Sequence, residues 1–315
     1  MTITRASAFA PATMANVGVG FDILGLAVDG AGDTVIAEWR EEPGAMILSI
    51  EGDNGKLPHE ADRNVASIAA NAYLKQIGAT HGIGIHLKKG LPLASGLGSS
   101  AASSVAAVVA ANTLCGSPLK QEELLDACLE GEAAVSGYHA DNVAPSLFGG
   151  ITLTNGTQIE RIRRIAPPPS LYMAFVTPNV AVPTAMARSA LPTHVTLKQM
   201  VQQTGAVAEL VDAIYRRDVR DMAAAMERDG IVEPARAHLM PLFGDMRPLA
   251  KEHGALALVI SGAGPTLCAV CDDEATAARV AQAMQDFYTA EGYASLARHG
   301  KVRAEGATGQ VLETR

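Results

Sequence analysis

The amino-acid sequence predicts an α+β protein of two domains. Its 315 residues suffice for two hydrophobic cores, and 48% of them are hydrophobic against 18% charged, as in ordered globular chains. Strand-like and helical segments follow one another without internal repeats. The clearest linker is Pro167–Pro169, so we expect an N-terminal domain at residues 1–167 and a C-terminal domain at residues 168–315.

The first half is expected to open with strands that glycine-rich segments interrupt. Alternating or β-branched runs predict strands at Thr2–Ala8, Leu24–Val28, Thr34–Trp39, Met46–Ile50 and Gly82–Leu87, and one that follows Gly149–Gly150. We expect a loop over Pro11–Gly20, after the first of these strands, and a turn over Asp29–Asp33. The segment that begins at His139 and continues Ala-Asp-Asn is expected as a loop flanked by glycines. Helical spacing predicts helices at Asn64–Ile77, from Ser99, and from Ser117 to Val135, with Ser117 as N-cap and Pro118 next.

The second half has a recognisable order of elements. The patterns predict, in turn, a strand at Leu171–Val176, helix within Leu197–Arg228, strands at Ala255–Ile260 and Thr266–Val270, a helix at Glu274–Tyr288 and closing extended segments. Strand, helix, strand, strand, helix, strand is the order of the split βαβ motif. We therefore expect a ferredoxin-like C-terminal domain.

Charge and cysteine usage narrow the function classes. The formal net charge is −8, and the only short basic cluster is Arg161–Arg164, so a nucleic-acid partner is disfavoured. The apolar stretch Ala101–Leu114 is too short to cross a bilayer. Cys268 and Cys271 have metal-like spacing but no second pair, and we expect buried structural thiols. With no secretory signal pattern, the expectation is a cytoplasmic protein without a membrane partner.

The segment Pro92–Ala102, of sequence PLASGLGSSAA, is the strongest chemical feature. A strand leads into it and a helix leaves it, so the first N–H groups of that helix face the glycine loop with the positive end of the helix dipole. Such a loop suits a polyphosphate. A Walker A loop is rejected because no lysine follows the glycines. A dinucleotide fingerprint matches weakly, and a tight turn without any ligand remains an alternative.

Two further glycine loops make a ligand-free turn less plausible. One is the segment PATMANVGVGFD at Pro11–Asp22, and the other is SGAGPT at Ser261–Thr266. Each pairs glycines with polar groups at the edge of a predicted strand. Because one of them lies in the second half, the three loops together predict a cleft between domains that surrounds phosphate groups from several sides.

In this order, the three loops resemble the motifs of the GHMP kinases, a family of ATP-dependent small-molecule kinases. The similarity runs from about residue 5 to about residue 270. It implies a two-domain GHMP kinase fold, with an N-terminal domain like domain 2 of ribosomal protein S5 and a ferredoxin-like C-terminal domain. The segment His139–Ser146 and the N-terminal loop resemble in particular the members that phosphorylate the amino acid L-homoserine, as in threonine biosynthesis.

The resemblance assigns the nucleotide and metal sites. ATP would bind the loop formed by Pro92, Leu93, Ala94, Ser95, Gly96, Leu97, Gly98, Ser99, Ser100, Ala101 and Ala102. Mg²⁺ would be held by Ser100 and Glu132, and Glu130 is left as a rival because the spacing from Glu132 to Asp141 is shorter than in relatives. Asn64 and Val65 are candidates for contacts to the nucleoside.

The resemblance also assigns the site for the phosphoryl acceptor. The matching positions for L-homoserine are Asn16, Asp22, His139, Thr184, Arg188, Arg236 and Gly264, of which the two arginines would bind its carboxylate. Asp141 and Asn142 are placed at the reacting groups without a claim that Asp141 abstracts a proton.

Several readings stay open at this point. The acceptor could be another alcohol, such as mevalonate or a shikimate-type compound, and the chain could be a non-catalytic sensor with the same fold. An intact Ser100, Glu132 and Asp141 argue against the sensor. An NAD-dependent oxidoreductase and an RNA-binding protein are remote. A homodimer is a further assembly that the sequence leaves open.

Overall fold

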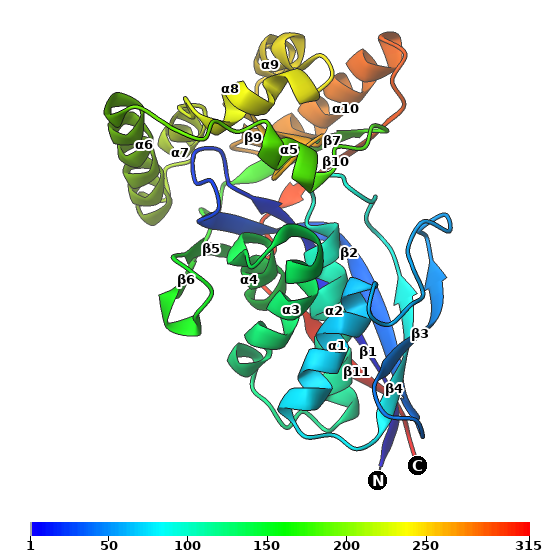
Figure 1. Ribbon diagram of the computed structural model, residues 1–315. Coiled ribbons are helices and arrows are strands. Elements are labelled where there is room, and N and C mark those ends of the chain that lie inside the picture. Colours follow the sequence, from blue (N-terminus) through cyan, green and yellow to red (C-terminus); the bar gives the residue numbers. More distant parts are fainter. Residues whose placement is uncertain (1) are drawn as a thin grey trace.

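The computed structural model describes residues 2–315 and shows two β-sheets, each packed against helices (Figure 1). The first sheet has seven strands and the second has four. The elements of the first are β1 (Ile3–Ala15), β2 (Leu24–Arg40), β3 (Ala45–Glu51), β4 (Gly82–Lys88), β5 (Ile151–Thr154), β6 (Ile162–Ile165) and β11 (Thr308–Thr314). Within the described range, no helix is long and apolar enough to cross a membrane.

Helices α1 to α4 lie together on one side of this sheet in Figure 1: α1 (Val65–Gln76), α2 (Ser99–Leu114), α3 (Leu125–Ser136) and α4 (Ala140–Phe148). Helix α2 is buried almost all round, and its sequence SSAASSVAAVVAANTL explains how. Alanine and serine side chains let neighbouring backbones approach closely on every side. The helix is thus held at the centre of the first core, and its N-terminus is fixed relative to the sheet.

The second sheet has the strand order β10-β7-β9-β8, all antiparallel. Its strands are β7 (Tyr172–Pro178), β8 (Ala257–Ile260), β9 (Leu267–Cys271) and β10 (Ser295–Lys301). This is the ferredoxin-like order, which confirms the expectation for the second half. The helices of this half are α5 (Thr184–Ser189), α6 (Leu197–Arg216), α7 (Val219–Met226), α8 (Val232–Arg236), α9 (Phe243–Glu252) and α10 (Glu274–Ala290).

Three expectations for the first half are wrong. Strand β1 continues to Ala15, because residues 12–15 pair with residues 25–28 of β2, so the glycine loop is shorter than expected. Strand β2 is continuous: Pro11 pairs with Gly32 and Ala12 with Val28, and the expected turn is a bulge within one strand. Ser117 has φ of 57°, outside the range of an N-cap, and a 3₁₀ helix begins only at Gln121.

Two further differences concern helices. The segment after His139 was expected as a loop but forms α4, although Pro145 lies inside it. The expected helix at Leu197–Arg228 is divided, because Arg217 adopts φ of 60° and Asp218 caps a new helix by accepting bonds from Arg220 N and Asp221 N.

The end of the chain returns to the first sheet. Strand β11 pairs with β1, and Val302 bridges to Val28. The expected C-terminal domain ran to residue 315, whereas these last residues extend the N-terminal sheet, because β1 offers a free edge there. The division near Pro167–Pro169 lies between β6 and β7 and stays a proposal, with β11 assigned to the first unit.

Candidate active site

A cavity of about 450 Å³ brings the three glycine loops together. Its wall comes from the loop after β1, the loop before α2, the ends of α3 and α4 that face each other, α5, and the turn between β8 and β9. The predicted acceptor residues all line it: Asn16, Asp22, His139, Thr184, Arg188, Arg236 and Gly264. Asp141, Asn142, Ser100 and Glu132 line it as well.

The backbone carbonyl groups of the glycine loop are hydrogen-bonded to other segments of the chain. Four successive carbonyls, of residues 94–97, each accept a hydrogen bond from another part of the chain. The donors are, in order, Val182 N, Thr266 N, Ser261 Oγ and Thr13 N, at 3.4, 3.1, 2.7 and 3.0 Å. Because these acceptors are already bonded within the protein, they do not compete with a ligand for the amide groups of the loop, which suits the binding of an anion.

The start of α2 adds to this anion site. Its N-cap is Gly98 with φ of 63°, and no side chain caps the first N–H groups. The hydroxyls of Ser95 and Ser99 are buried without a hydrogen-bond partner among the described residues. Buried polar groups are normally paired, so these donors fit a ligand rich in oxygen atoms.

Not every residue of the predicted ATP loop reaches the cavity. Residues 93–96 and 98–100 line it. Leu97, Ala101 and Ala102 are buried in the first core, and Pro92 is exposed and does not line the cavity. The three buried side chains anchor the strand-to-helix connection in that core.

We expect Gly98→Ala to abolish nucleotide binding without unfolding the protein. An added Cβ would lie 1.9 Å from Thr13 Oγ1, and the left-handed φ adds about 1 kcal/mol of strain. Gly116→Ala is the matched control, because Gly116 also has positive φ but open space around a Cβ. ATP affinity measured by calorimetry should fall only in the first variant. Equal affinities in both would show that the close approach at Gly98 is unimportant.

Ser100 and Glu132 form the candidate metal site. Ser100 Oγ donates to Glu132 Oε2 at 2.7 Å, and Ser136 Oγ donates to the other carboxylate oxygen. Burial raises the pKa of Glu132, and the two serine hydroxyls oppose that rise. Glu130 is exposed, bonded to Tyr138 Oη at 2.9 Å, and outside the cavity lining. Among the described residues, no three His, Cys, Asp or Glu side chains cluster as a complete metal cage.

Asp22 and Arg188 form a bidentate ion pair at the other end of the cavity. Arg188 Nη1 and Nη2 lie 3.1 and 2.9 Å from the two carboxylate oxygens of Asp22, and His139 Nδ1 lies 3.6 Å from Asp22 Oδ2. Burial lowers the pKa of His139, which favours its neutral form. Arg188 Nε is buried without a partner among the described residues.

The loop after β1 presents Asp22 in a constrained backbone. Asn16 and Asp22 both have positive φ, of 70° and 60°, a conformation that asparagine and aspartate tolerate better than most residues. Asn16 Oδ1 accepts from Asp22 N at 3.1 Å, and Asn16 Nδ2 donates to Gly262 O at 3.0 Å. Asn16 therefore ties the Asp22 backbone to the turn that follows β8.

Arg236 is only 3% exposed, yet it lines the cavity. Its Nε donates to Ala187 O at 3.0 Å and its Nη1 to Gly262 O at 3.1 Å. Burial lowers the pKa of Arg236, and nearby Arg188 adds to the effect. Both guanidinium groups lie over the ring of Phe21, at 5.7 Å for Arg188 and 5.2 Å for Arg236. Two positive charges thus converge on one end of the cavity.

Asp141 and Asn142 open α4 between the two ends of the cavity. Thr13 Oγ1 donates to Asn142 Oδ1 at 2.7 Å, which orients the amide. Asp141 is buried, and that burial, together with the charges of Asp22 and Glu132, raises its pKa to about 7. The geometry brings every predicted acceptor, catalytic and metal residue into one cavity, although their roles remain predictions.

The raised pKa of Asp141 predicts how stability depends on pH. The folded protein holds this proton up to about pH 7, whereas an unfolded chain releases it near pH 4. The free energy of unfolding should therefore fall as pH rises from about 4 to about 7 and level off above. In Asp141→Asn, the free energy of unfolding measured in urea should depend less on pH, and the dependence that remains should come from Glu132. Asp62→Asn, on the exposed surface, should leave the pH dependence unchanged. An unchanged slope in Asp141→Asn would contradict the assignment.

Sequence reasoning missed a buried ion pair beside the glycine loop. Lys89 and Asp33 have side chains only 1% and 0% exposed, and they contact each other directly. Lys89 Nζ donates to Ser99 O at 3.0 Å and Ser103 Oγ at 2.8 Å, and Gly90 N donates to Asp33 Oδ1 at 3.0 Å. A lysine directly before the loop was the available signal, but Asp33 lies far away in the sequence.

Comparisons with known proteins give the family. The chain matches the GHMP kinases N terminal domain over residues 64–150 and the GHMP kinases C terminal domain over residues 210–290. It is 40% identical to the homoserine kinase of Chloroherpeton thalassium, covering 90% of this chain and 92% of that protein. It is 42% identical to the homoserine kinase of Arabidopsis thaliana, covering 90% and 79%.

The solved structures agree. The crystal structure of homoserine kinase from Cytophaga hutchinsonii matches with a TM-score of 0.92 and 40% identity over 97% of each chain. Mevalonate kinase from L. major, solved with R-mevalonate, matches with a TM-score of 0.71 but 15% identity, which shows a common fold alone. On this evidence, the chain belongs to the homoserine kinases of the GHMP kinase family.

Proposed function

We propose that this enzyme transfers the γ-phosphoryl group of ATP to the side-chain hydroxyl of L-homoserine, giving O-phospho-L-homoserine. ATP is the phosphoryl donor of the family. The observation that carries the choice of acceptor is the Asp22–Arg188 pair, which lines the same cavity as the glycine loop. It offers one negative and one positive group side by side, as a zwitterionic amino acid requires.

The triphosphate would lie along residues 93–100, where free amide groups and the start of α2 supply positive potential. Phosphoryl transfer depends mainly on positioning and charge neutralisation. Mg²⁺ fits beside Ser100 and Glu132, since a hydroxyl and a buried carboxylate are hard oxygen donors and the ion keeps further sites for water and phosphate. When bound, it would neutralise charge on the transferring phosphate. The rest of the account concerns the protein's own residues.

The acceptor end recognises both charges of the amino acid. Its carboxylate would take the place of Asp22 on Arg188, whose Nε is an additional free donor, and would also face Arg236. Its ammonium group would then pair with the released Asp22 carboxylate, with neutral His139 beside it. Mevalonate carries a carboxylate but no ammonium group, so it would leave Asp22 half-buried without a partner.

The hydroxyl of the acceptor would lie near Asp141 and Asn142. Asn142 is oriented by Thr13 and can hold the hydroxyl by a hydrogen bond. Asp141, with its pKa near neutrality, is the carboxyl group best suited to receive a proton there. Asp141→Asn decides this point: a loss in kcat below tenfold would exclude an essential base, and a loss of about 100-fold or more would identify one.

The proposal is tested by coupled ADP release with purified protein and a panel of acceptors. L-homoserine should support turnover, whereas mevalonate, shikimate and galactose should not. L-2-aminobutyrate, which lacks the hydroxyl, controls for ATP hydrolysis without an acceptor. Turnover on mevalonate rather than L-homoserine would refute the assignment of the acceptor, and ATP binding without any turnover would favour a sensor.

Two further points stay predictions. A homodimer is to be tested by the mass in solution. A cytoplasmic location is supported by the free thiols of Cys115, Cys128, Cys268 and Cys271, since reduced cysteines are typical of a reducing compartment.

A further inference from the structure

Arg236 is the last residue of a helix that is too short to be stable without contacts to its neighbours. Helix α8 has five residues, little more than one turn, and such a short helix is not stable by itself. A guanidinium group that binds a carboxylate must nevertheless be held to a fraction of an ångström. The contacts that fix α8 to its neighbours therefore decide where Arg236 points.

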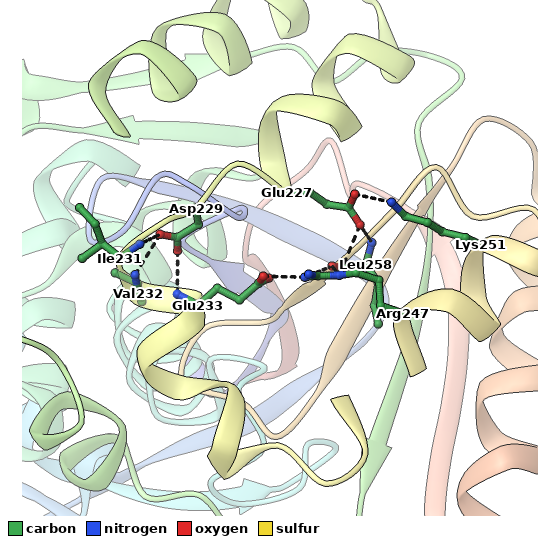
Figure 2. Close-up of polar contacts among 8 residues, drawn as sticks. All are labelled: Glu227, Asp229, Ile231, Val232, Glu233, Arg247, Lys251 and Leu258. Carbon is green, nitrogen blue, oxygen red and sulfur yellow. Dashed lines mark hydrogen bonds and ion pairs between the residues drawn. The ribbon is translucent and has the colours of Figure 1, made fainter. Parts of the chain in front are cut away.

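The start of α8 is fixed by Asp229. Its carboxylate accepts hydrogen bonds from Ile231 N and Val232 N at 2.9 Å each and from Glu233 N at 3.0 Å, as Figure 2 shows. Asp229 is 8% exposed, so these bonds are largely shielded from water. The carboxylate satisfies the free N–H groups of the helix and sets where it begins.

The side of α8 is fixed by Glu233 and Arg247. Arg247 Nη2 lies 2.6 Å from Glu233 Oε1, and Arg247 Nε and Nη2 also donate to Leu258 O, at 3.2 and 2.9 Å (Figure 2). The guanidinium lies 4.7 Å from the centre of the Phe243 ring. Burial raises the pKa of Glu233, and Arg247 opposes that rise. One arginine thus joins α8, α9 and the edge strand β8.

Glu227 completes the cluster from α7. Its Oε1 accepts from Leu258 N at 2.9 Å and lies 3.5 Å from Arg247 Nε, while its Oε2 pairs with Lys251 Nζ at 2.5 Å (Figure 2). Leu258 belongs to β8, the edge strand of the second sheet. Both its backbone N–H and its carbonyl are therefore bonded by side chains of this cluster.

The far end of α8 is tied to the same strand. Arg236 Nη1 donates to Gly262 O, two residues beyond the end of β8. Helix α8 is thus fastened to β8 at Leu258 through Arg247 and to its continuation at Gly262 through Arg236. A small cavity of about 10 Å³ lies beside these contacts; its lining includes Asp229, Glu233 and Arg236 together with apolar residues, and its size suits one water molecule.

We propose that the cluster of Glu227, Glu233 and Arg247 is a positioning device for Arg236 and so sets the affinity for the acceptor's carboxylate. The inference rests on the proposed role of Arg236 in binding L-homoserine. The cluster does not line the active-site cavity of about 450 Å³, which the nucleotide loop borders. Its effect should therefore fall on the acceptor and not on ATP.

The test compares KM values in variants that loosen the cluster. Arg247→Met and Glu233→Gln should raise KM for L-homoserine by about tenfold, with kcat and KM for ATP within about twofold of wild type, since a carboxylate contact serves ground and transition states alike. Arg247→Lys keeps the charge and should recover part of the affinity. Arg216→Met is the matched control, because Arg216 pairs with Asp212, Asp218 and Asp221 on the surface and touches nothing on α8.

A second readout does not depend on the substrate. The Nε–H of Arg236 is bonded to the carbonyl of Ala187 in a buried position, so its hydrogen exchange, followed by NMR, should be slow in wild type and at least several-fold faster in Glu233→Gln and Arg247→Met. Should wild-type protein fail to turn over L-homoserine, the proposed function is wrong, and the exchange rate still tests the positioning. Unchanged exchange, or a KM for L-homoserine within twofold of wild type in Glu233→Gln, would overturn the inference.

Discussion

Glu132→Gln is expected to lower kcat by about 10²–10³-fold, because the variant loses the carboxylate that accepts a hydrogen bond from Ser100 in the cavity. Glutamine keeps the size of the side chain and an oxygen that Ser100 can bond, but it is a far weaker ligand for Mg²⁺. The concentration of Mg²⁺ needed for half-maximal activity should rise as well. Folding should not suffer, since burial already disfavours the charged form and raises the pKa of Glu132.

Glu130→Gln is the matched control for this prediction. Glu130 lies on the same helix, two residues earlier, but it is exposed and bonded only to Tyr138. The control should keep wild-type kcat and wild-type Mg²⁺ dependence. The opposite pattern, with activity lost in Glu130→Gln and kept in Glu132→Gln, would move the metal ligand to Glu130.

Lys89→Met is expected to destabilise the protein by about 3–5 kcal/mol, because it leaves the Asp33 carboxylate buried without its counter-charge. Burial lowers the pKa of Lys89, and the charge of Asp33 opposes this, so the ammonium group of Lys89 depends on Asp33 to stay charged. The same change removes the bond from Lys89 to Ser99 O at the start of α2. ATP affinity should therefore fall together with the free energy of unfolding measured in urea.

Two further variants test whether the loss of stability comes from the unpaired buried charge. Lys88→Met changes the neighbouring exposed lysine, which lies 3.6 Å from Glu51, and should alter stability by less than about 0.5 kcal/mol. The double variant Asp33→Asn/Lys89→Met removes both charges and should be more stable than Lys89→Met alone. A double variant as unstable as the single one would show that the cost is lost packing and not an unpaired charge.

The local part of the site could be predicted from the sequence. Residues 93–100 follow a strand and precede a helix of small residues, and this neighbourhood alone indicates exposed amides beside the positive end of a helix. The structure adds what holds this loop: the carbonyls of residues 94–97 are all bonded by other segments. Two of these donors, Ser261 and Thr266, come from the third glycine loop. That loop therefore supports the first one as well as lining the cavity.

Contacts between residues that lie far apart in the sequence could not be predicted. Asp33 was predicted in a turn. Nothing near it in the sequence shows that β2 is continuous with a bulge there, or that Asp33 contacts Lys89. The segment after His139 reads as a loop because glycines flank it, yet packing against β1 and β2 makes it helix α4. Likewise, no local pattern relates Glu233 to Arg247 or sends β11 back to β1. Such pairings depend on the assembled fold and not on neighbouring residues.

A crystal structure of the protein with a non-hydrolysable ATP analogue, Mg²⁺ and L-homoserine tests the central claim most directly. The account predicts phosphate oxygens on the amides of residues 93–100, the metal between Ser100 and Glu132, and the amino acid between Asp22 and Arg188 with its hydroxyl toward the γ-phosphate. Phosphates bound elsewhere, or an acceptor whose carboxylate avoids both Arg188 and Arg236, would contradict it.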